Sequence, residues 1–257
     1  MIKVVIWILF LAFTSYALFC ALLYTKQRSM LYYPSPRATS NPADVIWLEN
    51  EGQTLKVWHV KSDSRKALIY FGGNAEDVSL GVAELSKLFP QHSLFIPHYR
   101  GYGGSSGKAT EEALYSDAMA LFQQVAETYD SIVIMGRSLG TGVAVYLVSR
   151  KAVDSLILVT PFDSMAQLAS SYYPFVPVSL LLKDKFDSVS RAADINVPTL
   201  VLIAEQDEVI PRKNSDRLVA RLNPSFTNAE VISGTGHNNI ETSPLYDTAV
   251  KSFIDSH

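Results

Sequence analysis

Cysteine is nearly absent from this sequence of 257 residues: its single copy, Cys20, lies in an apolar run near the N-terminus. The rest of the chain has no thiol, which excludes disulfides, a cysteine nucleophile and a cysteine-based zinc site. Runs of like charge, low-complexity segments and repeats at solenoid periods are also absent. Charged residues make up only 18% and the net charge is -3, a balance that argues against a nucleic-acid partner.

Cofactor and metal motifs are missing as well. The glycine cluster G-Y-G-G-S-S-G at 101–107 resembles a dinucleotide-binding loop, but Ser106 occupies the place of the third glycine in G-x-G-x-x-G. No H-E-x-x-H, EF-hand or P-loop pattern occurs in the sequence. We therefore expect neither a cofactor nor a metal.

One long apolar run, from Val4 to Tyr24, carries no charge. As a helix it would span roughly 30 Å, the thickness of a bilayer's hydrocarbon core. Trp7 and Tyr24 stand near its ends, where amphipathic rings prefer the membrane interface. The alternative is a cleaved signal peptide with its site near 15–17, but the apolar run continues well beyond that point. The pattern favours an uncleaved transmembrane anchor.

The charges around this run do not fix its orientation, because Lys3 precedes it and Lys26 and Arg28 come after it. A short basic N-terminus before a long apolar run is typical of a signal anchor that exports the domain behind it. We therefore expect an anchor over 1–28 and one extracytoplasmic domain over 29–257.

Short apolar runs alternate with helical patterns along the rest of the chain. This alternation predicts an α/β fold with a mostly parallel sheet flanked by helices. The expected strands are 45–49 and 54–60, paired through a turn at Glu51-Gly52, and then 67–71, 93–97, 131–135, 155–159, 199–204 and 229–232. The expected helices lie near 79–89, 111–128, 139–150, 212–222 and 243–255.

The motif Gly136-Arg137-Ser138-Leu139-Gly140 stands between an expected strand and an expected helix. This is G-x-S-x-G in the context that the motif requires. The serine sits on a tight, strained turn, and flanking glycines let the neighbouring backbone approach closely. We expect Ser138 to be a nucleophile.

A serine nucleophile needs a base, and the base needs an orienting acid. The chain order serine, acid, histidine selects His237, in G-T-G-H-N-N after the last expected strand, over a merely structural loop histidine. Asp207 comes after the strand 199–204 and is the favoured acid. Asp163, which would alternatively be a helix N-cap, is its rival, and Glu205 and Glu208 are lesser ones.

An oxyanion hole would complete such a site. The expected donors are the backbone N–H of Leu139, directly after the nucleophile, and that of Asn74 in Gly72-Gly73-Asn74. The alternative for this glycine pair is an ordinary turn. The irregular segment 164–193 stands where a lid belongs, and we expect Tyr172, Tyr173 and Phe175 in it to line an acyl-chain cleft. Simple packing over the core is the alternative for those side chains.

In combination, G-R-S-L-G, D-E-V-I-P, G-H-N-N and Y-R-G-Y-G-G-S-S-G resemble the α/β-hydrolase superfamily over essentially the whole chain. The stretch Gln27–Pro34, Q-R-S-M-L-Y-Y-P, is similar to the Q-x-x-L-x-Y-x-P of small hydrolases that begin with a transmembrane helix. These include serine-aminopeptidase-like and acyl-protein-thioesterase-like proteins. The loop often reads H-G-N-A-G, where this chain has Glu76 in the last place, and His98 replaces a usual aspartate.

The resemblance implies a membrane-anchored serine hydrolase that cleaves an ester, thioester or amide through an acyl-enzyme. Ser138, Asp207 and His237 would form its triad. Its expected partners are the membrane and an acyl-containing small molecule, lipid or acylated protein. Two alternatives stay open at this point: an aminopeptidase-like peptidase, and a non-catalytic binding protein that keeps the fold.

Overall fold

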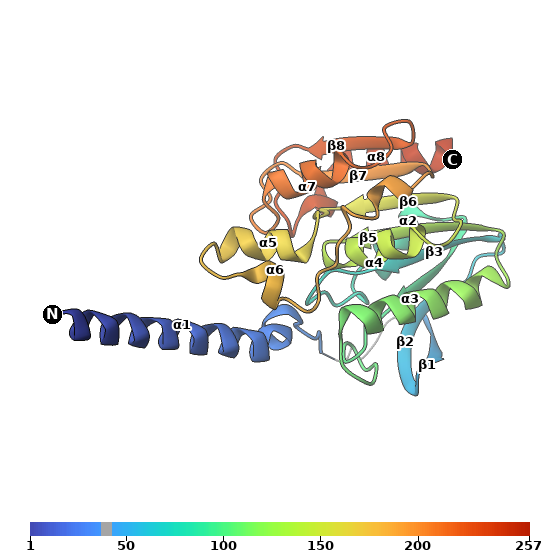
Figure 1. The fold of residues 1–257 in the computed structure, drawn as a ribbon. Helices are drawn as coiled ribbons and strands as arrows, with labels where there is room; N and C mark the ends of the chain where they lie inside the picture. Colours follow the sequence, from blue (N-terminus) through green and yellow to red (C-terminus); the bar gives the residue numbers. More distant parts are fainter. Residues whose placement is uncertain (37–42) are drawn as a thin grey trace.

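A computed structural model describes residues 1–36 and 43–257. Its centre is an eight-stranded sheet with strand order β1-β2-β4-β3-β5-β6-β7-β8 (Figure 1). β1 and β2 form a hairpin, β2 pairs antiparallel with β4, and every pairing from β4 to β8 is parallel. The strands are β1 Asp44–Asn50, β2 Gln53–Val60, β3 Lys66–Phe71, β4 His92–Pro97, β5 Ser131–Arg137, β6 Ser155–Val159, β7 Thr199–Ala204 and β8 Thr227–Ile232.

This arrangement confirms the expected α/β-hydrolase fold with its mostly parallel sheet. The hairpin turns at Glu51 and Gly52, whose φ angles are 49° and 70°, as a two-residue turn between twisted strands requires. The helices of the body are α2 Val82–Leu88, α3 Glu111–Ala126, α4 Leu139–Val148, α7 Arg212–Val219 and α8 Pro244–Ser256.

The first of these helices begins later than the sequence pattern predicts. Residues 79–81 form a turn instead of a helix. The backbone N–H and hydroxyl of Ser79 both donate to a carboxylate oxygen of Asp77, at 3.1 and 2.6 Å. This local side-chain turn competes with helix formation, so α2 starts only at Val82.

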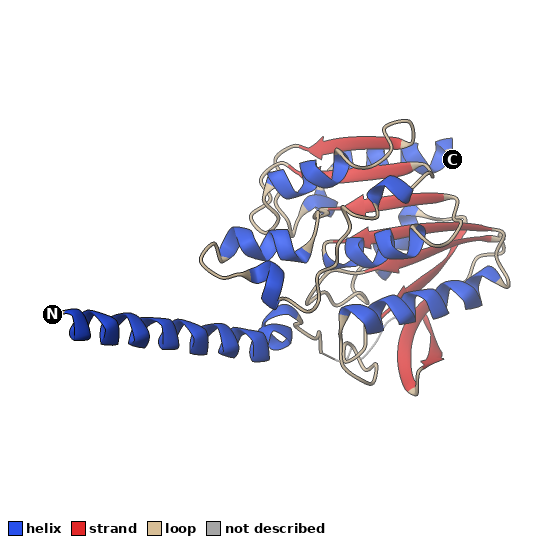
Figure 2. Ribbon diagram, viewed as in Figure 1, coloured by secondary structure: helices blue, strands red, loops and turns tan. Residues whose placement is uncertain are grey.

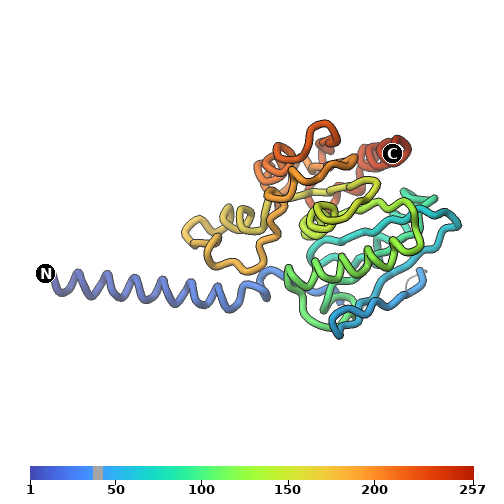
Figure 3. Tube along the Cα trace, turned by 45° about the vertical axis from the view of Figure 1, so that its right-hand side comes forward, coloured from blue at the N-terminus to red at the C-terminus, as the bar shows by residue number. Residues whose placement is uncertain are grey.

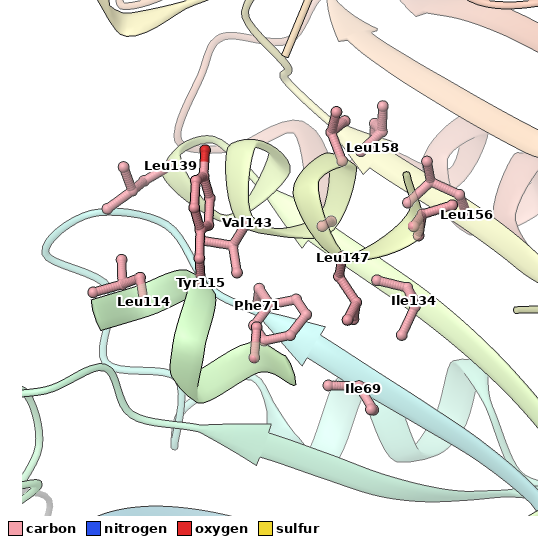
Figure 4. Close-up of a cluster of buried hydrophobic side chains, with 14 of the residues drawn as sticks. Ile69, Phe71, Leu114, Tyr115, Ile134, Leu139, Val143, Leu147, Leu156 and Leu158 are labelled. Carbon is pink, nitrogen blue, oxygen red and sulfur yellow. The ribbon is translucent and has the colours of Figure 1, made fainter. Parts of the chain in front are cut away.

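Helices lie on both faces of the sheet (Figure 2), and a hydrophobic cluster fills the space under each layer of helices. Along β3, Ile69 and Phe71 belong to the cluster under α3, α4 and α7, whereas Leu68 and Tyr70 belong to the cluster under α2 and α8. Successive strand residues point to opposite faces, so a continuous apolar run is buried on both sides. Figure 4 shows the first cluster, where Val143 of α4 lies beside Phe71.

A long helix, α1 (Ile2–Leu31), projects from the body with no buried residue (Figures 1 and 3). By length and composition it qualifies as a membrane span, and a signal sequence would pass the same test. It extends three residues beyond residue 28, and the division into an anchor and a catalytic domain stays a prediction. The lid segment contains α5 (Met165–Tyr172) and α6 (Val178–Leu181), and it ends within a 3-10 turn at Ala192–Asp194.

Candidate active site

Ser138 lies at the turn between β5 and α4, at the carboxyl edge of the sheet, with φ 48° and ψ -115°. Few non-glycine residues adopt this conformation, and the surrounding packing has to maintain it. The Ser138 N–H donates to the Val159 carbonyl at 2.9 Å, which ties the turn to β6. A Cβ on Gly140 would lie 2.0 Å from the Phe71 carbonyl oxygen, so only glycine fits there.

His237 brings its imidazole ring to this serine. Its Nε2 lies 2.9 Å from Ser138 Oγ, and its Nδ1 lies 2.9 and 3.0 Å from the two carboxylate oxygens of Asp207. The side chains of His237 and Asp207 are only 6% and 5% exposed. A buried carboxylate on Nδ1 fixes the tautomer in which Nε2 accepts the serine proton. The three side chains thus form the hydrogen-bond chain that acyl transfer needs.

Asp207 is held by its own loop. One carboxylate oxygen accepts the backbone N–H groups of Val209 and Ile210, at 2.9 and 2.7 Å. Apart from His237, the carboxylate is therefore held in its orientation by backbone N–H groups. Its position after β7, beyond the carboxyl end of the strand, is the one that the sequence predicts.

The rival acids have other partners. Glu208 accepts the His237 backbone N–H at 3.0 Å, and that N–H together with its own lowers the pKa of the Glu208 carboxyl. Glu205 accepts the Gly234 N–H at 2.8 Å. Asp163 accepts from the Asn214 side chain at 2.8 Å. Glu205 and Glu208 thus shape the loop that carries His237, and Asp163 holds α7 to the sheet.

The loop after β3 lies against the nucleophile, since a Cβ on Gly73 would be 3.6 Å from Ser138 Cβ. The backbone N–H groups of Asn74 and Leu139 have no acceptor among the described residues. Leu139 is the first residue of α4, where free amides and the helix dipole favour negative charge. Both expected oxyanion donors therefore stand near Ser138, and their role stays a prediction.

Glu76 is a residue whose part in the site the sequence did not indicate. Its carboxylate accepts the Gly73 N–H at 2.5 Å, the Tyr70 hydroxyl at 2.8 Å and Arg137 Nη1 at 3.1 Å. Arg137 also donates to the His237 carbonyl at 3.1 Å. The pair joins the oxyanion loop to the histidine loop. Its only sequence signal is that Glu76 stands where the family often has glycine.

Arg137 keeps its charge in this partly buried position. Burial by itself lowers the pKa of the guanidinium, but attraction to Glu76 and other neighbours outweighs it, so the pKa is raised overall. The side chains of Arg137 and Glu76 are 14% and 18% exposed. A charge pair with so little water around it couples the two loops more strongly than a surface pair would.

The three expected substrate residues lie in the lid. Tyr172 and Tyr173 line an apolar cavity of about 340 Å³ between the lid and the end of α1. Phe175 is 87% exposed at the tip of the lid and is not part of the cavity wall. The structure therefore brings two of the three to one cavity and leaves Phe175 outside it.

Comparison with known proteins identifies the family. The chain is 34% identical over 235 residues to an uncharacterized protein of Mycobacterium tuberculosis, covering 85% of this chain and 83% of that one. It is 31% identical over 199 residues to α/β hydrolase domain-containing protein 17C of Mus musculus, covering 74% of this chain and 60% of that protein. It is 30% identical over 199 residues to the α/β hydrolase domain-containing protein aho-3 of Caenorhabditis elegans, covering 75% of this chain and 58% of that protein.

Solved structures agree on the fold. The Pyrococcus furiosus esterase Pf2001 superposes with a TM-score of 0.70 at 17% identity, over 88% of this chain and 97% of that one. Est1E of Butyrivibrio proteoclasticus superposes with a TM-score of 0.69 at 15% identity, over 82% and 98%. No family model matches the sequence. The chain belongs to the α/β-hydrolase superfamily, and this membership supports a hydrolase.

Proposed function

We propose that this protein is a membrane-anchored serine hydrolase that cleaves an ester or thioester through an acyl-enzyme. One observation carries the proposal: His237 Nε2 lies 2.9 Å from Ser138 Oγ while Asp207 holds the opposite ring nitrogen at 2.9 Å. Nucleophile, base and orienting acid are within hydrogen-bond reach in the order that acyl transfer needs.

In the first half of the reaction, His237 Nε2 takes the proton of Ser138 as Oγ attacks the acyl carbon. The N–H groups of Leu139 and Asn74 bind the oxyanion of the tetrahedral intermediate. The carbon–leaving-group bond then breaks, and His237 gives its proton to the departing alcohol or thiol. In the second half, His237 takes a proton from water, the hydroxide adds to the acyl carbon, and Ser138 recovers the proton as the carboxylic acid leaves.

The test is covalent labelling of the purified full chain with a fluorophosphonate probe, which phosphonylates an activated serine. We expect labelling of wild type, none in Ser138→Ala, and strong reduction in His237→Gln. Ser252→Ala, at an exposed position of α8, is the matched control and should label like wild type. A folded wild-type protein that does not label would instead be a non-catalytic binding protein.

The anchor is part of the proposal. It rests on the unbroken helix Ile2–Leu31, with a mean hydropathy of 2.3 over its apolar window and none of that window buried. We expect the protein to stay with membranes after carbonate extraction and to keep its N-terminal residues by intact mass. A mature chain that starts near residue 18 would make the segment a signal peptide.

The peptidase alternative is tested on the same preparation. A free α-amino group calls for an acidic pocket, whereas the cavity beside the site is mostly lined by apolar side chains. We therefore expect p-nitrophenyl esters to be hydrolysed at least about a hundredfold faster than aminoacyl p-nitroanilides, a difference of roughly 3 kcal/mol in transition-state stabilisation. Faster cleavage of the anilides would favour the peptidase.

A further inference from the structure

Resting on the hydrolase proposed above, we propose that the cavity between α1 and the lid binds the acyl chain of a membrane lipid ester, so that the anchor helix forms one wall of the substrate site. The cavity of about 340 Å³ is within the size range of ligand pockets. Leu23, Met30 and Leu31 of α1 form one wall, and Leu168, Ala169 and Tyr172 of α5 face them.

One end of the cavity adjoins the oxyanion loop. Leu31, in the α1 wall, accepts a hydrogen bond from the Asn74 side chain at 2.6 Å. Asn74 is the neighbour of Gly73, which lies against Ser138. The α1 wall is therefore joined by a single hydrogen bond to the loop that would hold the oxyanion.

The opposite wall adjoins the acid of the site. Val209 lines the cavity, and its N–H donates to Asp207, which holds His237. The Tyr172 hydroxyl donates to the Val209 carbonyl at 2.7 Å, which closes this side of the cavity. Each wall thus contacts a loop that carries part of the Ser138–His237 site. In this proposal, an acyl chain in the cavity has its carboxyl end toward the nucleophile.

The other end of the lid reaches along the apolar part of α1. The Tyr16 hydroxyl donates to the Phe175 carbonyl at 2.8 Å. Tyr16 precedes Tyr24 by about two helical turns, or roughly 12 Å. Figures 1 and 3 both show the segment between α5 and α6 beside the second half of α1. With α1 in a bilayer, the lid tip lies within the membrane.

The side chains of the lid tip suit that position. Phe175 and Leu180 are 87% and 82% exposed, and transfer of such apolar side chains from water to an apolar environment is favourable. In a bilayer they are solvated by lipid. The cavity then opens toward hydrocarbon rather than water, which favours an occupant that already resides in the membrane.

Polar contacts hold the lid in a fixed position against the end of α1, so the cavity between them is preformed. Arg28 donates to both carboxylate oxygens of Asp184, at 2.8 and 3.0 Å, and the Asp184 side chain is only 3% exposed. The Gln27 side chain donates to the Leu181 carbonyl at 3.0 Å and accepts the Lys183 N–H at 2.7 Å. A preformed apolar cavity binds a chain without first having to order its walls.

The test uses the full chain in nanodiscs and compares p-nitrophenyl dodecanoate with p-nitrophenyl butyrate. In wild type, kcat/KM should rise by up to about fourfold for each methylene that enters the cavity. Leu23→Trp fills the cavity from the α1 side and should lower the dodecanoate-to-butyrate ratio at least about tenfold. Leu22→Trp is the matched control, because Leu22 is 56% exposed and outside the cavity wall.

Ala169→Trp fills the same space from the lid and should lower the ratio as Leu23→Trp does, which protects the test against a variant that fails to fold. Equal ratios in Leu23→Trp, Ala169→Trp and Leu22→Trp, with butyrate still hydrolysed, would overturn this assignment and leave the hydrolase intact. A folded wild type that neither cleaves butyrate nor labels with fluorophosphonate would overturn the hydrolase itself, and this assignment with it.

A second experiment tests whether the acyl group comes from a lipid or from an acylated protein. Nanodiscs carry either a fluorogenic diacyl phospholipid or an S-acylated peptide with the same acyl chain. Release of fatty acid from the phospholipid, reduced in Leu23→Trp but not in Leu22→Trp, supports the lipid. Cleavage of the peptide with the phospholipid left intact would overturn the assignment to a lipid ester.

Discussion

The side chain of Asn74 donates a 2.6 Å hydrogen bond to the carbonyl of Leu31, the last residue of the N-terminal helix. Its amide oxygen accepts from the Tyr33 N–H at 3.1 Å and from the Tyr102 hydroxyl at 2.8 Å. Two of these three hydrogen bonds hold the segment that leaves α1, and the third ties Asn74 to the loop after β4. The backbone N–H of the same residue is the proposed oxyanion donor, so Asn74 links the helix α1 to the proposed active site.

Replacing Asn74 should therefore disturb catalysis without removing the proposed donor. In Asn74→Ala the backbone N–H remains, but three hydrogen bonds are lost. We expect kcat for p-nitrophenyl butyrate to fall about tenfold, and the free energy of unfolding to drop by about 1–3 kcal/mol. Steady-state kinetics and thermal melting measure the two effects. Wild-type values for both would contradict the link between Asn74 and the site.

The choice of acid is tested by two matched substitutions. Asp207→Asn keeps the shape but loses the charge that stabilises the imidazolium, and kcat should fall by about ten-thousandfold while the protein stays folded. Asp163→Asn should instead cost about 1–3 kcal/mol of stability, since that carboxylate is 1% exposed and binds Asn214 and Arg217. Its kcat should change by less than about tenfold. The reverse pattern would make Asp163 the acid.

Much of this site could be predicted from the sequence, because its parts carry local signals. Apolar runs predicted where the strands lie in the sequence. The motif G-x-S-x-G located Ser138, and the order of serine, acid and histidine along the chain selected His237. The contacts between α1 and the lid left no such signal, since Arg28 and Asp184 are 156 positions apart. Sequence periodicity extends over a few turns, and pairs at that distance form only when the fold brings them together.

The contacts of Glu76 and Arg137 could not be predicted from the sequence either. The sequence marks Glu76 as a departure from the family pattern, yet not that it accepts from Gly73, Tyr70 and Arg137 at once. A carboxylate shortly after a glycine pair has many possible partners. The burial of Arg137 decides among them, and burial is a property of the fold.

The Glu76–Arg137 pair gives a third prediction. Glu76→Gln keeps an acceptor for the Gly73 N–H but removes the nearer of the two carboxylates around Arg137, leaving only the half-exposed Glu241 at 3.9 Å. Stability should therefore fall by about 2–4 kcal/mol. The double variant Glu76→Gln, Arg137→Gln should recover part of this loss, because the poorly paired charge is gone. Chemical denaturation of wild type, of the single variants Glu76→Gln and Arg137→Gln, and of the double variant gives the coupling energy. Additive losses would mean that the two side chains do not interact.

The last prediction concerns His98, which replaces the family's usual aspartate. Its ring is buried, with 1% exposed, and Nε2 accepts the Trp58 indole N–H at 2.9 Å. Burial lowers the pKa of His98 to about 4, and Lys56 acts in the same direction while Asp77 opposes both. Burial, with Lys66, likewise lowers the pKa of His92 to about 4.

Both shifts make the protein less stable in mild acid. Between the unfolded-state pKa of about 6.5 and the folded value, the unfolded chain binds more protons, so the free energy of unfolding falls as the pH is lowered. We expect each histidine to remove on the order of 2 kcal/mol between pH 6.5 and 4. His98→Asn keeps an acceptor for the Trp58 N–H and should roughly halve the part of the slope that the two histidines cause. Denaturant titrations at several pH values measure that slope, and a slope as steep as in wild type would show that His98 does not titrate in this way.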